Sequence, residues 1–372
     1  MNITETLNIR KLIGIMLIVL ISTLGIVSCD DDGDDPVDPD FDRAAMLESV
    51  ASNLIIPNFE ALQSSVNALE GAANTFAQST DEANLATLRT TWVQAVTDHQ
   101  HCSAFGFGPA NLSLGPYAKV LGTFPVSEEK VERNVVTGDV DLANTFDLNA
   151  KGFYTVEYLI YGNGATDAEL VASFDQARKD YLLLVIDDLT TTFDNIVSEW
   201  KSSYLQEFIS SDGTSAGSSI SLYYNEFVKD YENLKNFKLE LPAGLTAGQE
   251  SVDGSLVEAF YSGISRDLVE EHFENSKNIW FGLSRSGDPI IGFEEYLSEV
   301  EGGTALIATT KDAITVIDNA IAALPQGRLS DNIGANEVKV LRDELQANTA
   351  NFKSSMSSLL GISITFNSGD GD

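Results

Sequence analysis

The residues best suited to chemistry lie in one short stretch, 152–162, which reads Gly-Phe-Tyr-Thr-Val-Glu-Tyr-Leu-Ile-Tyr-Gly. Its only carboxylate is Glu157, and the neighbours are mostly aromatic or apolar. On a helix, Tyr154, Tyr158 and Tyr161 share a stripe with this acid, because residues three and four apart are neighbours. A lone buried acid is costly unless a partner pairs with it. Two interpretations follow: a solvated acid on a helix surface, which the pattern alone favours, or an acid held in a site.

The amino terminus has the pattern of a bacterial lipoprotein signal. Arg10 and Lys11 precede an apolar run that closes on Ile26-Val27-Ser28, and Cys29 follows. A basic start, a short apolar core and small residues before the cut are typical of secretory signals, and the cysteine resembles a lipobox. The alternative is a membrane-spanning helix, since the run is near the lower length limit for a span. We expect residues 1–28 to be a signal peptide and Cys29 to carry a lipid anchor.

The lipid anchor implies a place in the envelope of a Gram-negative bacterium, at the outer membrane, on its periplasmic side or at the cell surface. Residues 29–42 then form an acidic tether, because the run 30–40 is mostly Asp with Gly and Pro, and like-charge repulsion keeps it extended. A calcium loop carries a Glu at its twelfth position. This run lacks it, so we reject a calcium site there.

Charge and cysteine content exclude several classes of protein. The formal net charge is −34, and phosphate binding needs a basic face, so no nucleic-acid partner is expected. The acidity favours solubility and permits attraction to cations. Cys102 is the only cysteine after Cys29. We therefore expect no intrachain disulfide, and a Cys102 that behaves as a buried apolar residue.

Apolar periodicity favours helices nearly throughout the body of the chain. Pro57 should kink or break the first helix near Ile56. The segment 106–150 is rich in Gly, Pro and Asn without periodicity, and such a long segment in a helical protein is often functional. A strand-like alternation occurs only at 363–366. The expected helices cover 43–77, 79–105, 152 onward, 174–208, 218–237, 256–281, 301–324 and 335–360.

The economical architecture is all-α, with two tandem four-helix bundles. A Ser/Gly-rich linker at 210–219 marks the boundary. This gives an N-terminal domain at 43–212 and a C-terminal domain at 213–372.

A weak internal sequence repeat suggests that the two halves of the chain arose by duplication. Gly152-Phe153 and the Glu-Tyr-Leu at 157–159 are answered by Gly292-Phe293 and the Glu-Tyr-Leu at 295–297. If the halves face one another, acids from both could meet at their interface. Glu294 and Glu295 are therefore candidates to assist Glu157.

Several motifs, in order along residues 43–372, together resemble the imelysin family of bacterial lipoproteins and periplasmic proteins. The resemblance rests chiefly on four features: a proline-containing first helix, a tryptophan helix that ends in a Phe-Gly-Pro turn, a Gly-x-His-x-x-Glu-Tyr-Leu motif, and a distinctive carboxyl end. The matching residues are Ile55-Ile56-Pro57, Trp92, Phe105 to Pro109 with Gly108 before the proline, Gly152 to Leu159, Leu241-Pro242-Ala243-Gly244, the Ser262-to-Gly282 helix, and Leu360-Gly361 with Phe366 to Asp372.

This resemblance implies two four-helix-bundle domains with the Gly-x-His-x-x-Glu region at a groove between them. Proteins similar to this were named as metallopeptidases because of the His-x-x-Glu pair. Other members are linked to iron acquisition rather than proteolysis. The resemblance thus implies either a metal site or a ligand groove around Gly152, Phe153 and Glu157.

The chain departs from the family pattern where a metal ligand is expected. Tyr154 stands in the position of the histidine, and the acid of the tryptophan helix falls at Ser103. A zinc hydrolase needs three protein ligands and an open water position. His99 and His101 are two apart on a helix and cannot bind one ion together without unwinding. His101 alone either points to the groove or is solvated.

Three functions remain open on the sequence. The first, which we favour, is a non-catalytic binding protein that captures iron or another metal or ligand in the groove and works with envelope iron-uptake components. Hard oxygen donors such as tyrosinate and carboxylate suit ferric iron, so Tyr154, Glu157 and Tyr158 are candidates. The second is a metallopeptidase with a degenerate motif and Glu157 as base. The third is a structural module, in which the tyrosines and Glu157 only join the bundles.

Overall fold

The computed structural model describes residues 41–138, 140–143, 145–249 and 251–366. The signal peptide, Cys29, nearly all of the tether and the last residues of the carboxyl-terminal motif lie outside this part. Within it, none of the helices combines the length and apolar character needed to span a membrane.

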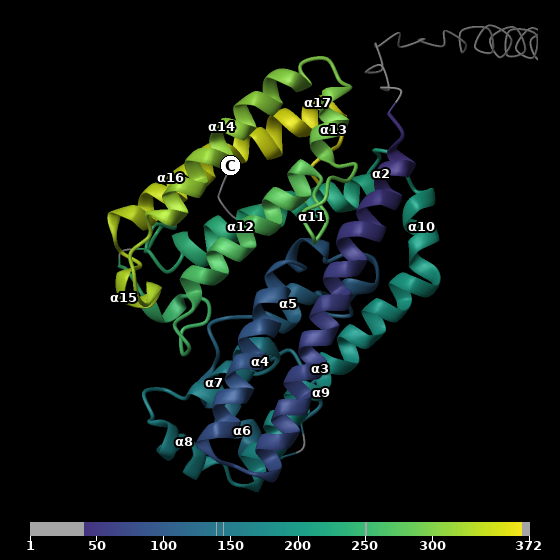
Figure 1. Ribbon diagram of the computed structural model, residues 1–372. Helices are drawn as coiled ribbons and strands as arrows, with labels where there is room; N and C mark the ends of the chain where they lie inside the picture. Colours follow the sequence, from purple (N-terminus) through teal and green to yellow (C-terminus); the bar gives the residue numbers. More distant parts are fainter. Residues whose placement is uncertain (1–40, 139, 144, 250, 367–372) are drawn as a thin grey trace, which may run out of the picture. The chain divides into compact units, whose positions relative to one another are not determined.

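Four helices of the first half pack in a closed ring (Figure 1). Helix α3 contacts α4, α4 contacts α7, α7 contacts α9, and α9 contacts α3. Helix α3 buries Phe59, Leu62 and Val66 at the three- and four-residue spacing that places them on one face. The helices of this half are α2 Arg43–Val50, α3 Ile56–Gln78, α4 Glu82–Gln100, α5 Tyr117–Leu121, α6 Glu128–Thr137, α7 Gly152–Tyr161, α8 Asp167–Ser173, α9 Gln176–Glu199 and α10 Leu205–Ser210.

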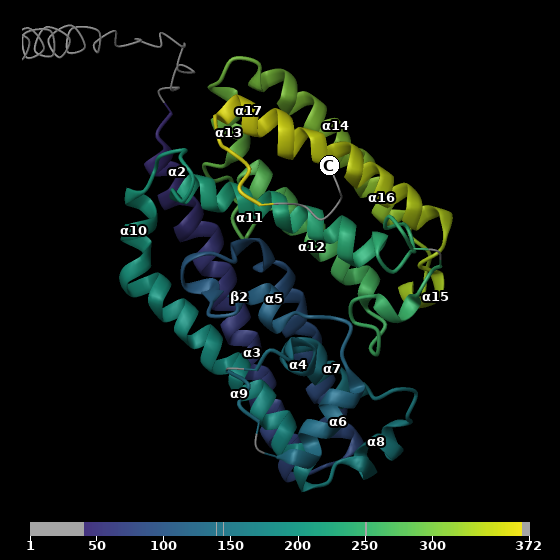
Figure 2. The same ribbon diagram turned by 180° about the vertical axis from the view of Figure 1, so that it is seen from behind.

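The second half repeats the arrangement with α11, α12, α14 and α16, which contact one another in a second ring (Figure 2). Its helices are α11 Ser219–Asn233, α12 Ser265–Phe281, α13 Phe293–Ser298, α14 Gly303–Ala322, α15 Leu329–Asn332, α16 Asn336–Thr349 and α17 Met356–Leu360. The all-α fold is thereby confirmed. The described residues after position 40 pack as one compact unit, so the division into domains at 212 and 213 stays a prediction.

Helix breaks follow local chemistry. Pro57 has no N–H to donate, and the chain before it widens into the π-helical turn Ala51–Ile55, as expected for a break near Ile56. Asp81 caps α4 by accepting from the backbone N–H of Asn84. Further π-helical turns lie at Trp200–Tyr204, Leu234–Glu240 and Ala350–Ser355.

Several sequence predictions need correction. Residues 363–366 form no strand, and the short antiparallel pair is instead β1 Asn111–Leu112 with β2 Gly115–Pro116. This pair lies inside the supposedly irregular segment 106–150, which also contains α5 and α6. Helix α4 ends at Gln100, before the glycines, and α12 begins only at Ser265 because a turn-rich segment precedes it.

Candidate functional site

Helix α7 is the central element of the site. All residues from Gly152 to Ile160 are buried, so the helix is enclosed on every side rather than half exposed. Its start depends on a glycine: the φ of Gly152 is +77°, and a Cβ there would stand 2.0 Å from the carbonyl oxygen of Leu121. This close approach to α5 fixes the direction in which Tyr154 and Glu157 leave the helix.

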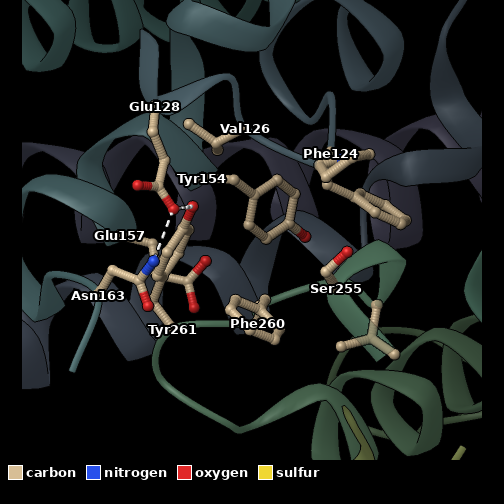
Figure 3. Close-up of a pocket in the computed structure, with 12 residues that line it drawn as sticks. Phe124, Val126, Glu128, Tyr154, Glu157, Asn163, Ser255, Phe260 and Tyr261 are labelled. Atoms are coloured by element: carbon tan, nitrogen blue, oxygen red, sulfur yellow. Dashed lines mark hydrogen bonds between the residues drawn. The ribbon is translucent and has the colours of Figure 1, made fainter. Parts of the chain in front are cut away.

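The side chains of Tyr154 and Glu157 reach a cavity of about 340 Å³, and residues of both halves of the chain line it (Figure 3). We call this cavity the Glu157 pocket. Its lining consists of Phe124, Pro125, Val126, Glu128, Tyr154, Glu157, Asn163, Ser255, Val257, Ala259, Phe260 and Tyr261. Two of these side chains are acidic, and none is Lys, Arg or His.

Glu157 is only 1% exposed. Its Oε1 accepts hydrogen bonds from the backbone N–H and from Oγ–H of Ser262, each at 2.7 Å. Burial raises the pKa of the carboxyl to about 7, although the two Ser262 bonds act in the opposite direction. Near neutral pH the side chain is therefore divided between acid and carboxylate.

Tyr154 belongs to a second buried network. Its hydroxyl donates to Glu258 Oε1, whose Oε2 lies 2.8 Å from Lys238 Nζ. Gln100 joins them, donating to Glu258 at 3.1 Å and accepting from Lys238 at 2.5 Å. Burial, together with the nearby Glu258 charge, holds the pKa of Tyr154 well above its ordinary value. Burial opposes ionisation of Glu258, but the Lys238 ammonium, the Tyr154 hydrogen bond and nearby His272 together lower the pKa of that carboxyl.

Tyr158 stands behind the pocket wall rather than in it. Its hydroxyl donates to Glu132 at 2.7 Å, and Arg178 pairs with the same carboxylate at 2.8 Å. Burial, reinforced by Glu132, raises the pKa of Tyr158 to about 12. Its ring packs on Tyr261, with 5.1 Å between the centroids, and Tyr261 donates to Glu128 at 3.1 Å. Tyr158 therefore supports the lining residue Tyr261, which in turn binds Glu128.

With this geometry in view, the comparison with known families is direct. The sequence matches the model of the family named Imelysin over residues 55–356. The chain belongs to the imelysin family.

Relatives agree with the assignment. The Iron-regulated protein A of Synechococcus elongatus is 22% identical over 320 residues, which is 81% of this chain and 84% of that protein. A solved structure described as an iron-regulated protein A precursor from Parabacteroides distasonis matches with a TM-score of 0.73 at 19% identity, covering 88% of this chain and 97% of that one. An imelysin-like protein from Psychrobacter arcticum matches with a TM-score of 0.69 at 19% identity over 87% and 97%. These likenesses show the imelysin fold.

The other predicted site residues of this imelysin lie elsewhere. His101 Nε2 is 2.8 Å from Glu271 Oε2 at the contact of α4 with α12, and it lines no pocket described here. Glu294 pairs with Lys311 at 2.6 Å, and Glu295 is exposed. Neither acid lines the Glu157 pocket, so the two Gly-Phe helix starts do not bring their acids together.

The remaining motif residues have packing roles. Phe153 stacks on the His99 ring at 4.7 Å between centroids. Gly108, with φ of +54°, approaches the Tyr204 ring so closely that a Cβ would stand 2.2 Å from it. Pro109 continues the same turn. Cys102 is fully buried, as expected, and it forms no disulfide with another described residue.

A resident metal does not fit the donors of this imelysin site. Tyr154 keeps its proton, because burial raises its pKa, and uses the hydroxyl to donate to Glu258. The Lys238 ammonium already neutralises Glu258 and repels a cation. Glu157 and Glu128 remain as the two acids of the lining, and Glu128 already accepts hydrogen bonds from Tyr261 and Asn163. Among the described residues, no group of three or more His, Cys, Asp and Glu side chains is arranged to hold a metal ion.

Sequence reasoning missed Ser262, Glu258 and Lys238, the partners from the second half. Ser262 and Glu258 lie 105 and 104 positions from their contacts in α7, and Lys238 lies 138 positions from Gln100. No local pattern links residues at such distances. One signal was available for Glu258, which stands alone among Val257, Ala259 and Phe260, as Glu157 does among its tyrosines. An isolated acid in an apolar run is a sign of a buried, paired carboxylate.

Proposed function

We propose that this imelysin is a non-catalytic binding protein of the cell envelope that serves iron uptake and receives its ligand in the Glu157 pocket. The observation that carries the proposal is the position of Glu157: a buried acid, held by Ser262 from the other half, in the wall of a cavity with no basic side chain. A buried acid without a base is costly. A titratable group perturbed by burial within a cavity is a functional candidate.

The lining defines what the ligand offers. Glu128 and Glu157 supply negative charge and hydrogen-bond acceptors, whereas Phe124 and Phe260 supply apolar faces. A ligand with hydrogen-bond donors or positive charge and some apolar surface complements this wall. A strongly anionic ligand does not, because two acids repel it.

The link to iron comes from relatives named iron-regulated protein A. A bare ion would find only two acids in this lining, Glu128 and Glu157, so we propose that iron arrives as the complex of an organic chelator. The chelator then fills the coordination sphere of the iron, and the outer groups of the chelator form hydrogen bonds with the pocket. The proteolytic alternative needs a metal-activated water, for which this site does not supply the ligands.

Equilibrium dialysis tests the proposal. The chain from residue 29 with Cys29→Ser, purified without lipid, is dialysed against ferrous iron, ferric citrate and an uncharged ferric trihydroxamate complex. We expect retention of the trihydroxamate complex near one per chain, and weak retention of the anionic citrate complex. Glu157→Gln should weaken retention at least about tenfold, the equivalent of one charge-assisted hydrogen bond.

Glu294→Gln is the matched control, since Glu294 pairs with Lys311 away from the pocket, and it should bind as the parent does. Failure to retain any iron form, or equal retention by Glu157→Gln, would contradict the proposal.

A structural role for Glu157 has one observation in its favour, the two hydrogen bonds from Ser262 that join the halves. If joining is its whole role, Glu157→Gln lowers the free energy of unfolding and leaves iron retention unchanged. The binding proposal predicts that retention falls in chains that are still folded.

We also infer that Cys29 anchors the protein to the envelope through lipid, on the strength of the lipobox-like sequence. The expected result of Cys29→Ser is a shift from the membrane fraction to the soluble fraction of fractionated cells. Cys102→Ala should remain with the membranes. An unchanged distribution for Cys29→Ser would rule out the anchor.

A further inference from the structure

A second cavity, of about 420 Å³, also has walls from both halves. Its lining shares Phe124 with the Glu157 pocket and no other residue. The hydrogen bond from Tyr154 to Glu258 joins a residue of the first lining to a residue of the second. We call this second space the Asp230 cavity, after the acid in its buried wall.

Asp230 has an unused acceptor. The residue is 5% exposed, and its Oδ2 accepts from Ser103 Oγ at 2.8 Å and lies 2.9 Å from His272 Nε2. Within the described part of the chain, Oδ1 has no hydrogen-bond partner. A buried carboxylate normally has both oxygens satisfied, so this oxygen is available to a ligand.

His99 is the second unused acceptor of the cavity. It is 4% exposed, and its Nδ1 is buried without a hydrogen-bond partner among the described residues. Nε2 faces Gly122, another lining residue, where a Cβ would stand 2.7 Å away. Burial lowers the pKa of His99 to about 4. The ring is therefore neutral near pH 7 and does not repel a cation.

The remaining charges of the lining are largely paired with one another. Lys229 lies 2.9 Å from Glu226, and Lys238 lies 2.8 Å from Glu258. Outside these pairs, the lining has Asp230, which contacts the His272 ring in the buried wall, and Lys119 on the exposed rim. Asp230 is therefore the acid of the interior that neither Lys nor Arg pairs with.

An exposed aromatic ring lies at the same cavity. Phe237 is 53% exposed, although the next residue, Lys238, is buried. Both belong to the π-helical turn Leu234–Glu240, and such turns often occur at functional sites. A ring this exposed gains free energy when an apolar or cationic group covers it.

We propose that the Asp230 cavity binds a small organic amine with an apolar body. The ammonium group donates to Asp230 Oδ1 and to His99, and the apolar body packs on Phe124 and Phe237. No residue or geometry of the Glu157 pocket is required for this contact except the shared ring of Phe124.

Calorimetric titration of the chain from residue 29 with Cys29→Ser tests the proposal, with 2-phenylethylamine and the uncharged 2-phenylethanol as probes. The amine should bind at least about tenfold more tightly than the alcohol, since a charge-assisted hydrogen bond contributes that much. Asp230→Asn should remove this preference.

Phe237→Ala gives a second readout with little risk to folding, because the ring is half exposed. It should weaken amine binding severalfold, whereas Phe146→Ala, which removes a ring that is 85% exposed elsewhere, should not. Equal binding of amine and alcohol, no binding of either, or an unchanged amine affinity in both Asp230→Asn and Phe237→Ala would overturn the proposal.

Discussion

At the scale of residues, Glu157 and Glu258 are two buried acids that differ in partner. Glu258 has the Lys238 ammonium at 2.8 Å, which keeps the carboxylate charged. Glu157 has only the neutral donors of Ser262, so burial dominates and raises its pKa to about 7. The first acid is neutralised within the protein, and the second remains able to respond to a ligand or a proton.

Glu157→Gln should change how stability depends on pH. The folded chain binds the Glu157 proton more tightly than the unfolded chain, where the pKa is near 4.5. The contribution of Glu157 to the free energy of unfolding therefore falls as pH rises from about 4.5 to about 7. The fall is on the order of 3 kcal/mol.

Urea unfolding at a series of pH values measures this effect as the difference between parent and Glu157→Gln, in which the other titrating groups cancel. The parent should lose its relative stability across that window. A difference that does not vary with pH would show that Glu157 titrates normally.

At the scale of elements, the position of α7 depends on the contact of Gly152 with the Leu121 carbonyl. Gly152→Ala adds a Cβ 2.0 Å from that oxygen at a φ of +77°. A left-handed conformation costs a non-glycine residue about 1–2 kcal/mol, and overpacking adds about 1–3 kcal/mol. We expect a loss of about 3 kcal/mol or more in the free energy of unfolding.

Gly164→Ala is the matched control, because Gly164 has a φ of +76° but no atom within 4 Å of the added Cβ. Gly164→Ala should lower the free energy of unfolding only by the cost of the left-handed backbone conformation, about 1 kcal/mol. Equal losses in the two variants, measured by chemical unfolding, would mean that α7 does not depend on the close approach to α5.

Local chemistry predicted the helices well. Pro57 marked a real break, and Gly152 marked a real helix start, because both signals act within one turn of the chain. The pattern alone favoured a solvated Glu157 on the surface of this helix, since periodicity does not reveal that the polar atoms of Glu157 and Tyr154 have partners in another half. The candidate site was accordingly half predicted: the α7 side chains were identified, and Ser262, Glu258 and Lys238 were not.

At the scale of the whole molecule, polar contacts join the two halves beside the pockets. Arg285 donates to Asp98 Oδ1 at 2.5 Å and to Asn58 Oδ1 at 2.9 Å. Asp98 is 3% exposed, so it depends on this partner. The same interface contains the Ser262 to Glu157 hydrogen bonds, which ties the geometry of the pocket to the packing of the halves.

Arg285→Ala should lower the free energy of unfolding by about 3 kcal/mol, because it leaves a buried carboxylate without its cation. The loss is at the lower end for a buried pair, since the Arg285 side chain is 34% exposed. Arg133→Ala is the matched control: its ion pair with Asp147 has both side chains exposed, 52% and 37%. Such a pair contributes about 0–1 kcal/mol. Thermal or urea unfolding measures the loss of stability in both variants. If Arg133→Ala lost as much free energy of unfolding as Arg285→Ala, the interface pair would be no more important than an exposed one.

The most direct test of the central claim is anomalous diffraction at the iron edge from crystals grown with the ferric trihydroxamate complex. If the Glu157 pocket receives the ligand, one iron peak should lie within the space lined by Phe124, Glu157 and Tyr261, and it should be weaker in Glu157→Gln crystals grown with the same concentration of the complex. An iron peak elsewhere on the molecule, or none at saturating complex, would contradict the account.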